Sequence, residues 1–351
     1  MRLIRPWSLD DGTLTLDSTN VPDVPPTAYS AGTTYADGDT ASVLQADGFT
    51  YKVYESVVGS NTGNAVTDTD FWLYLGETYA EYNAGTTYDA DDIVISTTTN
   101  HAYKALTGGE SGNALSNAAK WLDLGPTNRY KAFDNSNTSQ TSNGESITYT
   151  ITVSGRADAI AFLNIVAAEI HIVMSTAEDG ELINETVNLV TDSGINTWWE
   201  YFFEPVSRLG DYVRYELPSN LNPTFEITIT DPGLTPRIGS LLIGQSRDLG
   251  DLLHGARLGI TDYSRKDTDD FGNSTIIQRA FAKRATLKAI IPNTRVDSII
   301  ALLAQYRATA CVIVGHDIYA STYIYGFYKG FEVELAFEEK SYLSIEWEGL
   351  T

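Results

Sequence analysis

The stretch Ser146-Ile147-Thr148-Tyr149-Thr150-Ile151-Thr152-Val153 alternates strictly between polar and apolar side chains. Successive side chains of a β-strand point to opposite faces of a sheet, so the pattern predicts a strand with one face buried and the other toward solvent. Threonine, isoleucine, valine and tyrosine are also the residue types that strands favour. The stretch therefore predicts an antiparallel sheet at the centre of the chain.

The sequence around this strand predicts further β-strands. Residues 159–174 are a nearly continuous apolar, β-branched run, which is typical of a buried strand pair. We expect two more strands at Trp198–Phe203 and Phe225–Thr230, the second ended by the turn Asp231-Pro232-Gly233. Residues 126–245 are thus predicted to form one antiparallel β-sandwich, similar to the jelly roll of galactose-binding-like domains.

The last third of the chain, residues 246–351, alternates strand patterns such as Ser274–Phe281 with one helix. The helix is predicted over Arg295–Arg307, with Thr294 capping its first turn and Asp297 three residues further on. Its apolar face has helical spacing and consists of Val296, Ile299, Ile300, Leu303 and Tyr306. Two closing strands are expected at Tyr323–Tyr328 and Tyr342–Trp347. The prediction is an antiparallel β domain with one α-helix.

An internal repeat occupies the region near the N-terminus. The segment Tyr29–Tyr35 (YSAGTTY) returns as Tyr82–Tyr88 (YNAGTTY), and further matches follow it. These pair Asp39 with Asp92, Tyr51-Lys52 with Tyr103-Lys104, Gly63-Asn64 with Gly112-Asn113, and Trp72 with Trp121. The offset shrinks from 53 to 49 residues, which indicates length differences in the loops. We predict two small β-modules, residues 28–76 and 77–125.

Aromatic residues dominate both modules because each has few aliphatic side chains. A unit of this size without disulfides or metal is close to the lower limit of independent stability, so it needs a dense centre. We expect Tyr35 and Trp72 in the first module, and Tyr88 and Trp121 in the second, to pack in the module cores.

The repeat pattern resembles the small carbohydrate-binding modules of bacterial chitinases. Their consensus has an aromatic residue, Gly, Tyr, Gly-Asp, an apolar pair, Tyr-Lys and a late Trp. The family's exposed tryptophans after Tyr-Lys are replaced here by Val53-Tyr54-Glu55 and by Ala105-Leu106-Thr107. The resemblance implies that sugar contact uses the exposed aromatic faces of Tyr51, Tyr54 and Tyr103.

Residues 1–27 hold a short alternating segment, Thr13-Leu14-Thr15-Leu16, followed by the proline-rich stretch Val21–Pro26. The first predicts one strand, for which we consider the C-terminal domain as partner. Proline fixes φ and lacks an N–H, so the second is a stiff spacer and marks a boundary. The fold class predicted for the whole chain is all-β and multidomain.

The net charge of −23 is unevenly distributed over the 351 residues. Residues 1–250 hold 12 basic and 33 acidic side chains (−21), whereas residues 251–351 hold 11 and 13 (−2). An acidic chain repels phosphate backbones, which argues against nucleic acid as a partner. Residues 1–7 lack the apolar stretch of a signal peptide, and no window approaches the roughly 20 apolar residues that span a bilayer. We expect no membrane insertion, and assembly in the cytoplasm of a bacterial host.

Residues that could carry catalysis are scattered. The single cysteine, Cys311, lies in an apolar run and is expected to be a buried hydrophobic residue. No zinc-protease helix, nucleophile elbow or phosphate loop is present, and the histidines are isolated: His101, His171, His254 and His316. The cluster Asp267–Asn273 resembles a calcium loop, but Phe271 and Gln278 stand where oxygen ligands are needed, which favours a turn with Gly272 at positive φ. We expect no enzyme activity, metal or cofactor.

The C-terminal third resembles the ring-forming domain of phage distal tail proteins and related tail-tip proteins. The likeness rests on the order of strands, the helix Arg295–Arg307, an apolar strand and two closing strands ending at Glu346–Thr351. The whole layout also resembles tail proteins of long-tailed phages that carry chitinase-type modules ahead of Asp262-Tyr263-Ser264 and Asp269–Asn273.

This resemblance implies a structural subunit of a phage tail tip or baseplate, located in the virion. Expected partners are other tail-tip proteins, further copies of the chain in a ring or other symmetric assembly, and a host cell-surface glycan. Two alternatives stay open: a carbohydrate-active enzyme component, chitinase-like or depolymerase-like, and a receptor-binding adhesin. A glycosidase needs a carboxylate pair, and a chain with 46 acidic residues offers many.

Overall fold

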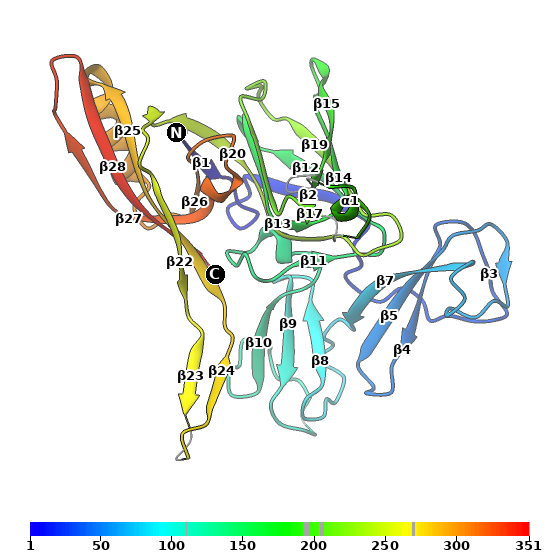
Figure 1. Ribbon diagram of the computed structural model, residues 1–351. Coiled ribbons are helices and arrows are strands. Elements are labelled where there is room, and N and C mark those ends of the chain that lie inside the picture. Colours follow the sequence, from blue (N-terminus) through cyan, green and yellow to red (C-terminus); the bar gives the residue numbers. More distant parts are fainter. Residues whose placement is uncertain (110, 192–196, 204–206, 269–270, 351) are drawn as a thin grey trace.

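The computed structural model describes residues 1–109, 111–191, 197–203, 207–268 and 271–350 (Figure 1). The architecture is all-β, with small modules, a sandwich and a C-terminal sheet region that carries a helix, which confirms the predicted fold class. Among the described residues, no helix is long and apolar enough to cross a membrane.

The alternating stretch at the centre forms strand β12 (Ser146–Val153). Its isoleucines, Tyr149 and Val153 are buried, while its serine and threonine side chains are partly exposed. β12 pairs with β19 (Thr224–Thr230) on one side and β2 (Leu14–Thr19) on the other. β14 (Glu169–Thr176) and β15 (Gly180–Asn188) complete a five-stranded sheet in the order β15-β14-β19-β12-β2.

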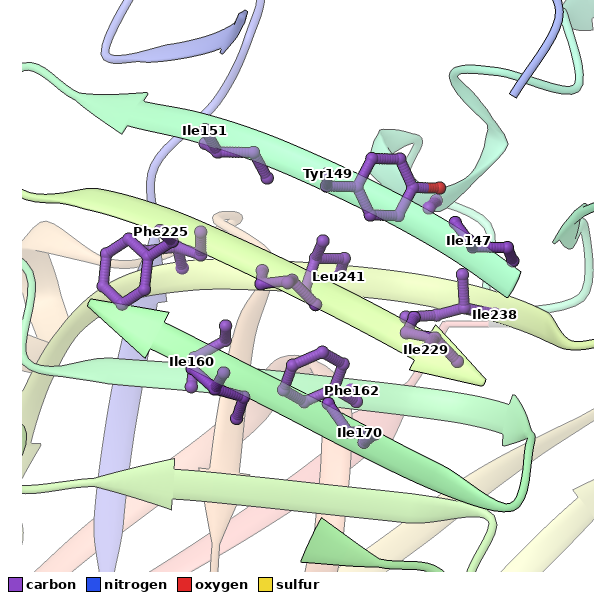
Figure 2. Packing of buried hydrophobic residues seen from close by; sticks show 14 of the residues in the cluster. Ile147, Tyr149, Ile151, Ile160, Phe162, Ile170, Phe225, Ile229, Ile238 and Leu241 are labelled. Atoms are coloured by element: carbon purple, nitrogen blue, oxygen red, sulfur yellow. The ribbon is translucent and has the colours of Figure 1, made fainter. Parts of the chain in front are cut away.

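The second layer of the sandwich consists of β13 (Ala159–Val166), β18 (Asp211–Tyr215) and β20 (Arg237–Asp248). Figure 2 shows how the two layers meet: Ile160, Phe162 and Leu241 lie against side chains of β12, β14 and β19. Phe162, Tyr149 and Phe225 are all at most 1% exposed. Burial of this apolar surface is the main force holding the layers together.

The N-terminal strand joins the sandwich to the C-terminal region. β1 (Arg2–Pro6) pairs antiparallel with β20 on one side and β26 (Cys311–Val314) on the other. The result is an 11-stranded sheet that contains β18, β13, β20, β1, β26, β27 (Tyr323–Glu334), β28 (Lys340–Gly349), β25 (Phe281–Pro292) and β21 (Asp251–Leu252) in this order. β11 (Thr141–Ser142) and β22 (Arg257–Asp262) pair with β20 and β25.

Two details of this sheet differ from expectation. The predicted strand at residues 13–16 falls in β2, but it pairs with β12 of the sandwich, because Leu14 and Leu16 complete the apolar face that β12 buries. The strand that joins the C-terminal sheet is β1 instead, where Leu3 and Ile4 are at most 1% exposed. β20 continues through the expected boundary at residue 245, so the two regions share one sheet.

Helix α2 (Val296–Gln305) buries Val296, Ile299 and Leu303 against β25 and β28, while Ile300 is 38% exposed. The predicted cap at Thr294 is wrong: the chain enters through the 3₁₀ turn Asn293–Arg295, and the N-cap is Arg295, without a side-chain cap hydrogen bond. The Ser298 hydroxyl donates to the Arg295 carbonyl at 2.8 Å. Packing of the apolar face, rather than capping, therefore fixes this helix.

The strand predicted at Trp198–Phe203 is wrong, because these residues form a short helix, α1. The run does not alternate, so it offers no single face for a sheet to bury. Aromatic rings four residues apart meet instead, with centroids 6.4 Å apart for Trp198 and Phe202 and 5.5 Å for Trp199 and Phe203. These four side chains are 65–80% exposed.

The repeats form two separate small sheets. Module 1 has a three-stranded sheet of β4 (Thr40–Leu44), β5 (Thr50–Ser56) and β7 (Trp72–Tyr79), with the short pair β3 (Thr34–Tyr35) and β6 (Asn61–Thr62). Module 2 has β8 (Ile93–Ser96), β9 (His101–Ala105) and β10 (Trp121–Pro126).

The remaining elements are short. Two-stranded pairs form between β16 (Val190–Thr191) and β17 (Ser207–Arg208), and between β23 (Arg265–Thr268) and β24 (Ser274–Ile277). Further 3₁₀ turns lie at Lys131–Phe133 and Ala320–Thr322. The predicted strand Ser274–Phe281 is interrupted after Ile277, and β25 begins at Phe281.

Candidate functional site

Each module is built around three aromatic rings. In module 1, Tyr35 and Trp72 meet edge to face with centroids 4.9 Å apart, and Tyr29 meets Trp72 at 5.7 Å. In module 2, Tyr88 and Trp121 are 5.4 Å apart, and the equivalent of Tyr29 is Tyr82, 5.6 Å from Trp121. The edge-to-face geometry is the favoured one for aromatic quadrupoles.

The Gly-Asn pair that recurs in the sequence holds these rings in place. The indole N–H of Trp72 and the hydroxyl of Tyr29 both donate to the Asn64 carbonyl, at 3.1 and 2.8 Å. Trp121 and Tyr82 donate to the Asn113 carbonyl in the same way, at 3.3 and 2.6 Å. The glycines before the two asparagines both have φ of 78°, which accounts for the residue type.

The residues predicted as module cores are therefore found close together. Tyr35, Trp72 and Trp121 are at most 6% exposed, and Tyr88 is partly buried. Tyr35 and Tyr88 each accept a hydrogen bond at 2.8 Å on the hydroxyl, from the backbone N–H of Ser30 and of Asn83.

Strand register corrects one match between the repeats. Trp72 lies opposite Ser56, and Trp121 lies opposite Ala105, so β5 and β9 correspond with an offset of 49. Tyr103 consequently takes the place of Tyr54, not that of Tyr51. The turn between β4 and β5 is longer than that between β8 and β9, and this difference produces the misleading Tyr-Lys match.

An exposed aromatic pair lies on module 1. Tyr54 on β5 faces Tyr74 on β7 with ring centroids 5.5 Å apart and planes inclined at 56°. Tyr74 is 42% exposed and Tyr54 is partly buried. Burial, and then the Glu77 carboxylate, raises the pKa of Tyr74 to about 12, and the same two causes raise the pKa of Tyr54. Both phenols are protonated at neutral pH and can donate hydrogen bonds.

A groove of about 900 Å³ opens beside this pair, between module 1 and the sandwich. Trp72, Leu73 and Tyr74 line it from β7, and Glu145, Arg208, Asp231 and Arg237 line it from the sandwich. Arg208 forms a bidentate ion pair with the buried Asp231, with N–O distances of 2.5 and 3.0 Å. A volume of this size with a few convergent polar groups suits a small-molecule or oligosaccharide ligand.

Gly144 fixes one wall of the groove. A Cβ added at this position would lie 2.2 Å from the Tyr74 carbonyl oxygen, closer than real contacts allow. Only glycine lets the two backbones approach so closely.

Asp23 links module 1 to the chain that follows module 2. Its carboxylate accepts a hydrogen bond from Thr127 at 3.0 Å, and its carbonyl accepts one from Thr78 on β7. Burial raises the pKa of Asp23.

Module 2 differs at the equivalent surface. Asp123 stands where module 1 has Tyr74, and both its carboxylate oxygens lie 2.9 Å from Nδ1 of His101. Tyr103 is only 8% exposed, and its hydroxyl is 3.0 Å from Oγ1 of Thr99. Of the three tyrosines expected to contact sugar, Tyr51 and Tyr54 are partly exposed and Tyr103 is buried. Its ring therefore has no exposed face for stacking.

Sequence reasoning missed Tyr74, Arg208 and Asp231. Tyr74 had a usable signal, because it follows the repeated Trp at a position where the second repeat has Asp123. Arg208 and Asp231 had none, since they lie far from module 1 in the sequence and reach the groove only through the packing of module 1 on the sandwich.

The remaining candidates do not converge on a catalytic site. No group of three or more metal-ligating side chains occurs among the described residues. Nε2 of His171 lies 2.8 Å from Oδ1 of Asn184. Burial raises the pKa of the Cys311 thiol to about 12. In the calcium-like segment, Gly272 has φ of +84°, whereas Asp269 and Asp270 lie outside the described residues.

Comparison with known proteins adds no name to this site. No protein-family model matches the chain. No curated protein matches it significantly either.

Proposed function

We propose that the chain is a structural subunit of a phage tail tip or baseplate that self-assembles at the tail end and carries an accessory glycan-binding site. One observation supports the structural part most strongly. The near-neutral residues 251–351 and β1 form a continuous sheet backed by α2, in the order of strands and helix on which the likeness to distal tail proteins rests. A surface with little net charge suits packing against other subunits.

The site in module 1 supports the glycan-binding part. A sugar ring presents C–H groups to an aromatic face and hydroxyls to polar neighbours. Tyr74 supplies an aromatic face in the groove and Tyr54 lies beside it, while Arg208, Glu145 and Arg237 supply charged groups across the groove from Tyr74. Binding by one open groove is expected to be weak, and a symmetric assembly strengthens it by multivalency.

A mass-spectrometric inventory of purified phage particles tests the structural proposal. We expect the chain in stoichiometric copies. A full-length gene with residues 28–125 replaced by a short Gly-Ser linker should still yield protein that is incorporated, because β1 and the shared sheet are retained. Absence of the chain from particles, or loss of incorporation on removing the modules while the protein stays folded, would overturn the proposal.

A glycan array probed with a multivalent form of the chain tests the binding site. Tyr74→Ala should remove binding. Tyr319→Ala serves as the matched control, because Tyr319 is an exposed tyrosine that does not line the groove. Gly144→Ala should also weaken binding by pushing module 1 away from the sandwich. Binding that survives both changes would contradict this site.

An activity assay distinguishes the enzyme alternative from glycan binding alone. Glu145 and Asp231 both line the groove, but Asp231 is held by Arg208, which argues against a free carboxylate pair. Release of reducing ends from a polysaccharide panel by the wild-type chain, lost in Glu145→Gln, would favour the enzyme.

A further inference from the structure

A two-stranded ribbon projects from the C-terminal sheet. β22 and the start of β25 leave the sheet together, and β23 and β24 continue the ribbon (Figure 1). We call residues 257–268 and 271–284 the hairpin arm. Within the described residues, β23 and β24 pair only with each other. A two-stranded ribbon is at best marginally stable alone in water, and its unpaired edges are templates for another strand.

The hairpin arm exposes apolar side chains along its length. Leu258 and Ile260 on β22 and Ile276 on β24 are 44%, 55% and 77% exposed. Tyr263 and Phe281, at the junction between the two parts, are about half exposed. Isoleucine and leucine at such exposure on a strand ribbon are typical of a surface that another protein covers.

The charge of the hairpin arm is opposite to that of the rest of the chain. The arm has 6 basic and 2 acidic residues (+4) in a chain of net charge −23, which leaves −27 elsewhere. Among the described residues, two ion pairs involve the arm, Arg265 with Asp267 and Lys283 with Asp211. Lys266 and Arg279 are exposed and form no described ion pair.

The sandwich has an acidic edge strand, β15. β15 is the outermost strand of the five-stranded sheet, and its other edge is unpaired in the described residues. Residues 178–185 contain no basic residue. Glu178 and Asp179 stand just before β15 and Glu181 on it, whereas Glu185 is ion-paired with Arg214. The edge thus matches the arm in backbone geometry and in charge, as one strand adding to another requires.

We propose that the hairpin arm of one copy docks on the β15 edge of a second copy, adding its strands to that sheet. This inference rests on the proposed self-assembly and names the contact that performs it. Because arm and edge are different surfaces, the contact is heterologous, and such contacts form a ring when the rotation closes. The small modules take no part, in keeping with their expected dispensability for assembly.

Self-association of the purified full-length chain, measured by light scattering over a concentration and salt series, tests the contact. Lys266→Glu should weaken association about tenfold or more, because it places like charges opposite each other. Combining it with Glu181→Lys should restore association. Glu226→Lys is the matched control, since Glu226 is exposed on β19 in the middle of the same sheet.

A second pair of variants tests the apolar part of the contact without changing charge. Ile276→Thr keeps a β-branched residue and should weaken association, whereas Ile318→Thr should not, although Ile318 is equally exposed at 76%. Zero-length crosslinking of mixed ¹⁵N-labelled and unlabelled chains should join Lys266 of one copy to Glu178, Asp179 or Glu181 of another.

The outcomes separate the two proposals. Association that is unchanged in Lys266→Glu and Ile276→Thr overturns docking by the arm and leaves the tail-tip role standing. A chain that stays monomeric at all concentrations also overturns it, while presence in particles still decides the tail-tip role. Loss of association in Lys266→Glu with recovery in the charge-swapped double variant supports docking.

Discussion

The two small modules share one internal frame and differ on the surface. Trp72 and Trp121 each contact the equivalent pair of tyrosines in their own module at nearly the same distances. The indole N–H of each donates to the backbone carbonyl of an asparagine. Two residues further along the same strand, module 1 has Tyr74 and module 2 has Asp123. The frame sustains folding, so binding differences must come from residues that the frame does not use.

The comparison also shows how position in the whole molecule completes a site. Tyr74 lines the groove against the sandwich because Gly144 admits its backbone. Asp123 is instead engaged with His101 of its own module. In the part of the chain that the structure describes, only module 1 therefore combines an exposed aromatic pair with charged groups from another region.

The largest effect is expected for the shared tryptophans. Trp72→Ala and Trp121→Ala should each destabilise their own module by about 3–5 kcal/mol, because each leaves a large cavity in a small core. Hydrogen exchange followed by mass spectrometry should show fast exchange confined to residues 28–76 or 77–125. Trp199→Ala is the control, since Trp199 is 65% exposed and surface changes usually have small effects. A module that keeps its protection from hydrogen exchange after losing its tryptophan would show that the tryptophan is not essential to the module core.

The next effect concerns binding and tests the surface difference. Tyr74→Asp gives module 1 the residue of module 2, and we expect a loss of glycan affinity of at least about tenfold, equivalent to about 1.4 kcal/mol or more. Asp123→Tyr should not create binding in module 2, because Tyr103 is buried there. Isothermal titration with the glycan identified on the array measures both. A gain of binding in Asp123→Tyr would show that the groove is dispensable.

A smaller and equal effect is expected at the matched glycines. Gly63→Ala and Gly112→Ala place a Cβ at φ of 78°, where an L residue is strained by about 1 kcal/mol. Neither added Cβ would meet an atom closer than 4.0 Å, so strain is the whole effect. Urea unfolding should give the same loss for both modules. Unequal losses would mean that the two Gly-Asn turns are not equivalent.

Prediction from sequence succeeded where side-chain pattern decides structure. The alternation in β12, the helical spacing in α2 and the repeated aromatics each bury one face, and these are local properties. The pattern failed at Trp198–Phe203, where a run without alternation formed a helix whose aromatic rings are exposed. Propensity alone does not choose between strand and helix in such a run.

Register and long-range pairing were beyond the sequence. Residue type matches Tyr51-Lys52 to Tyr103-Lys104, but the strand register makes Tyr54, three residues after Tyr51, the equivalent of Tyr103. The insertion of β1 between β20 and β26 depends on contacts more than 200 residues apart. The groove likewise depends on packing between regions, which no local pattern encodes.

The smallest effect separates the modules by pH. Although burial opposes it, hydrogen bonds from the Gly125 N–H and from His101 lower the pKa of Asp123. A carboxyl whose pKa is lower in the folded state stabilises it above the unfolded value of about 3.9, and this contribution disappears as pH falls through the folded pKa. Asp123 is half exposed, so the contribution is only about 0.2–1 kcal/mol.

Asp123→Asn should therefore make module 2 less stable at pH 7 than wild type, and the difference should shrink as pH falls through the folded pKa of Asp123. Tyr74, the counterpart in module 1, has a pKa of about 12 and stays protonated throughout, so Tyr74→Phe should show no such pH dependence. Hydrogen exchange of residues 77–125 in wild type and variant, compared at matched pH values from 7 to 2, measures the difference. A gap that persists unchanged at pH 2 would mean that Asp123 acts through packing or hydrogen bonds rather than through its charge.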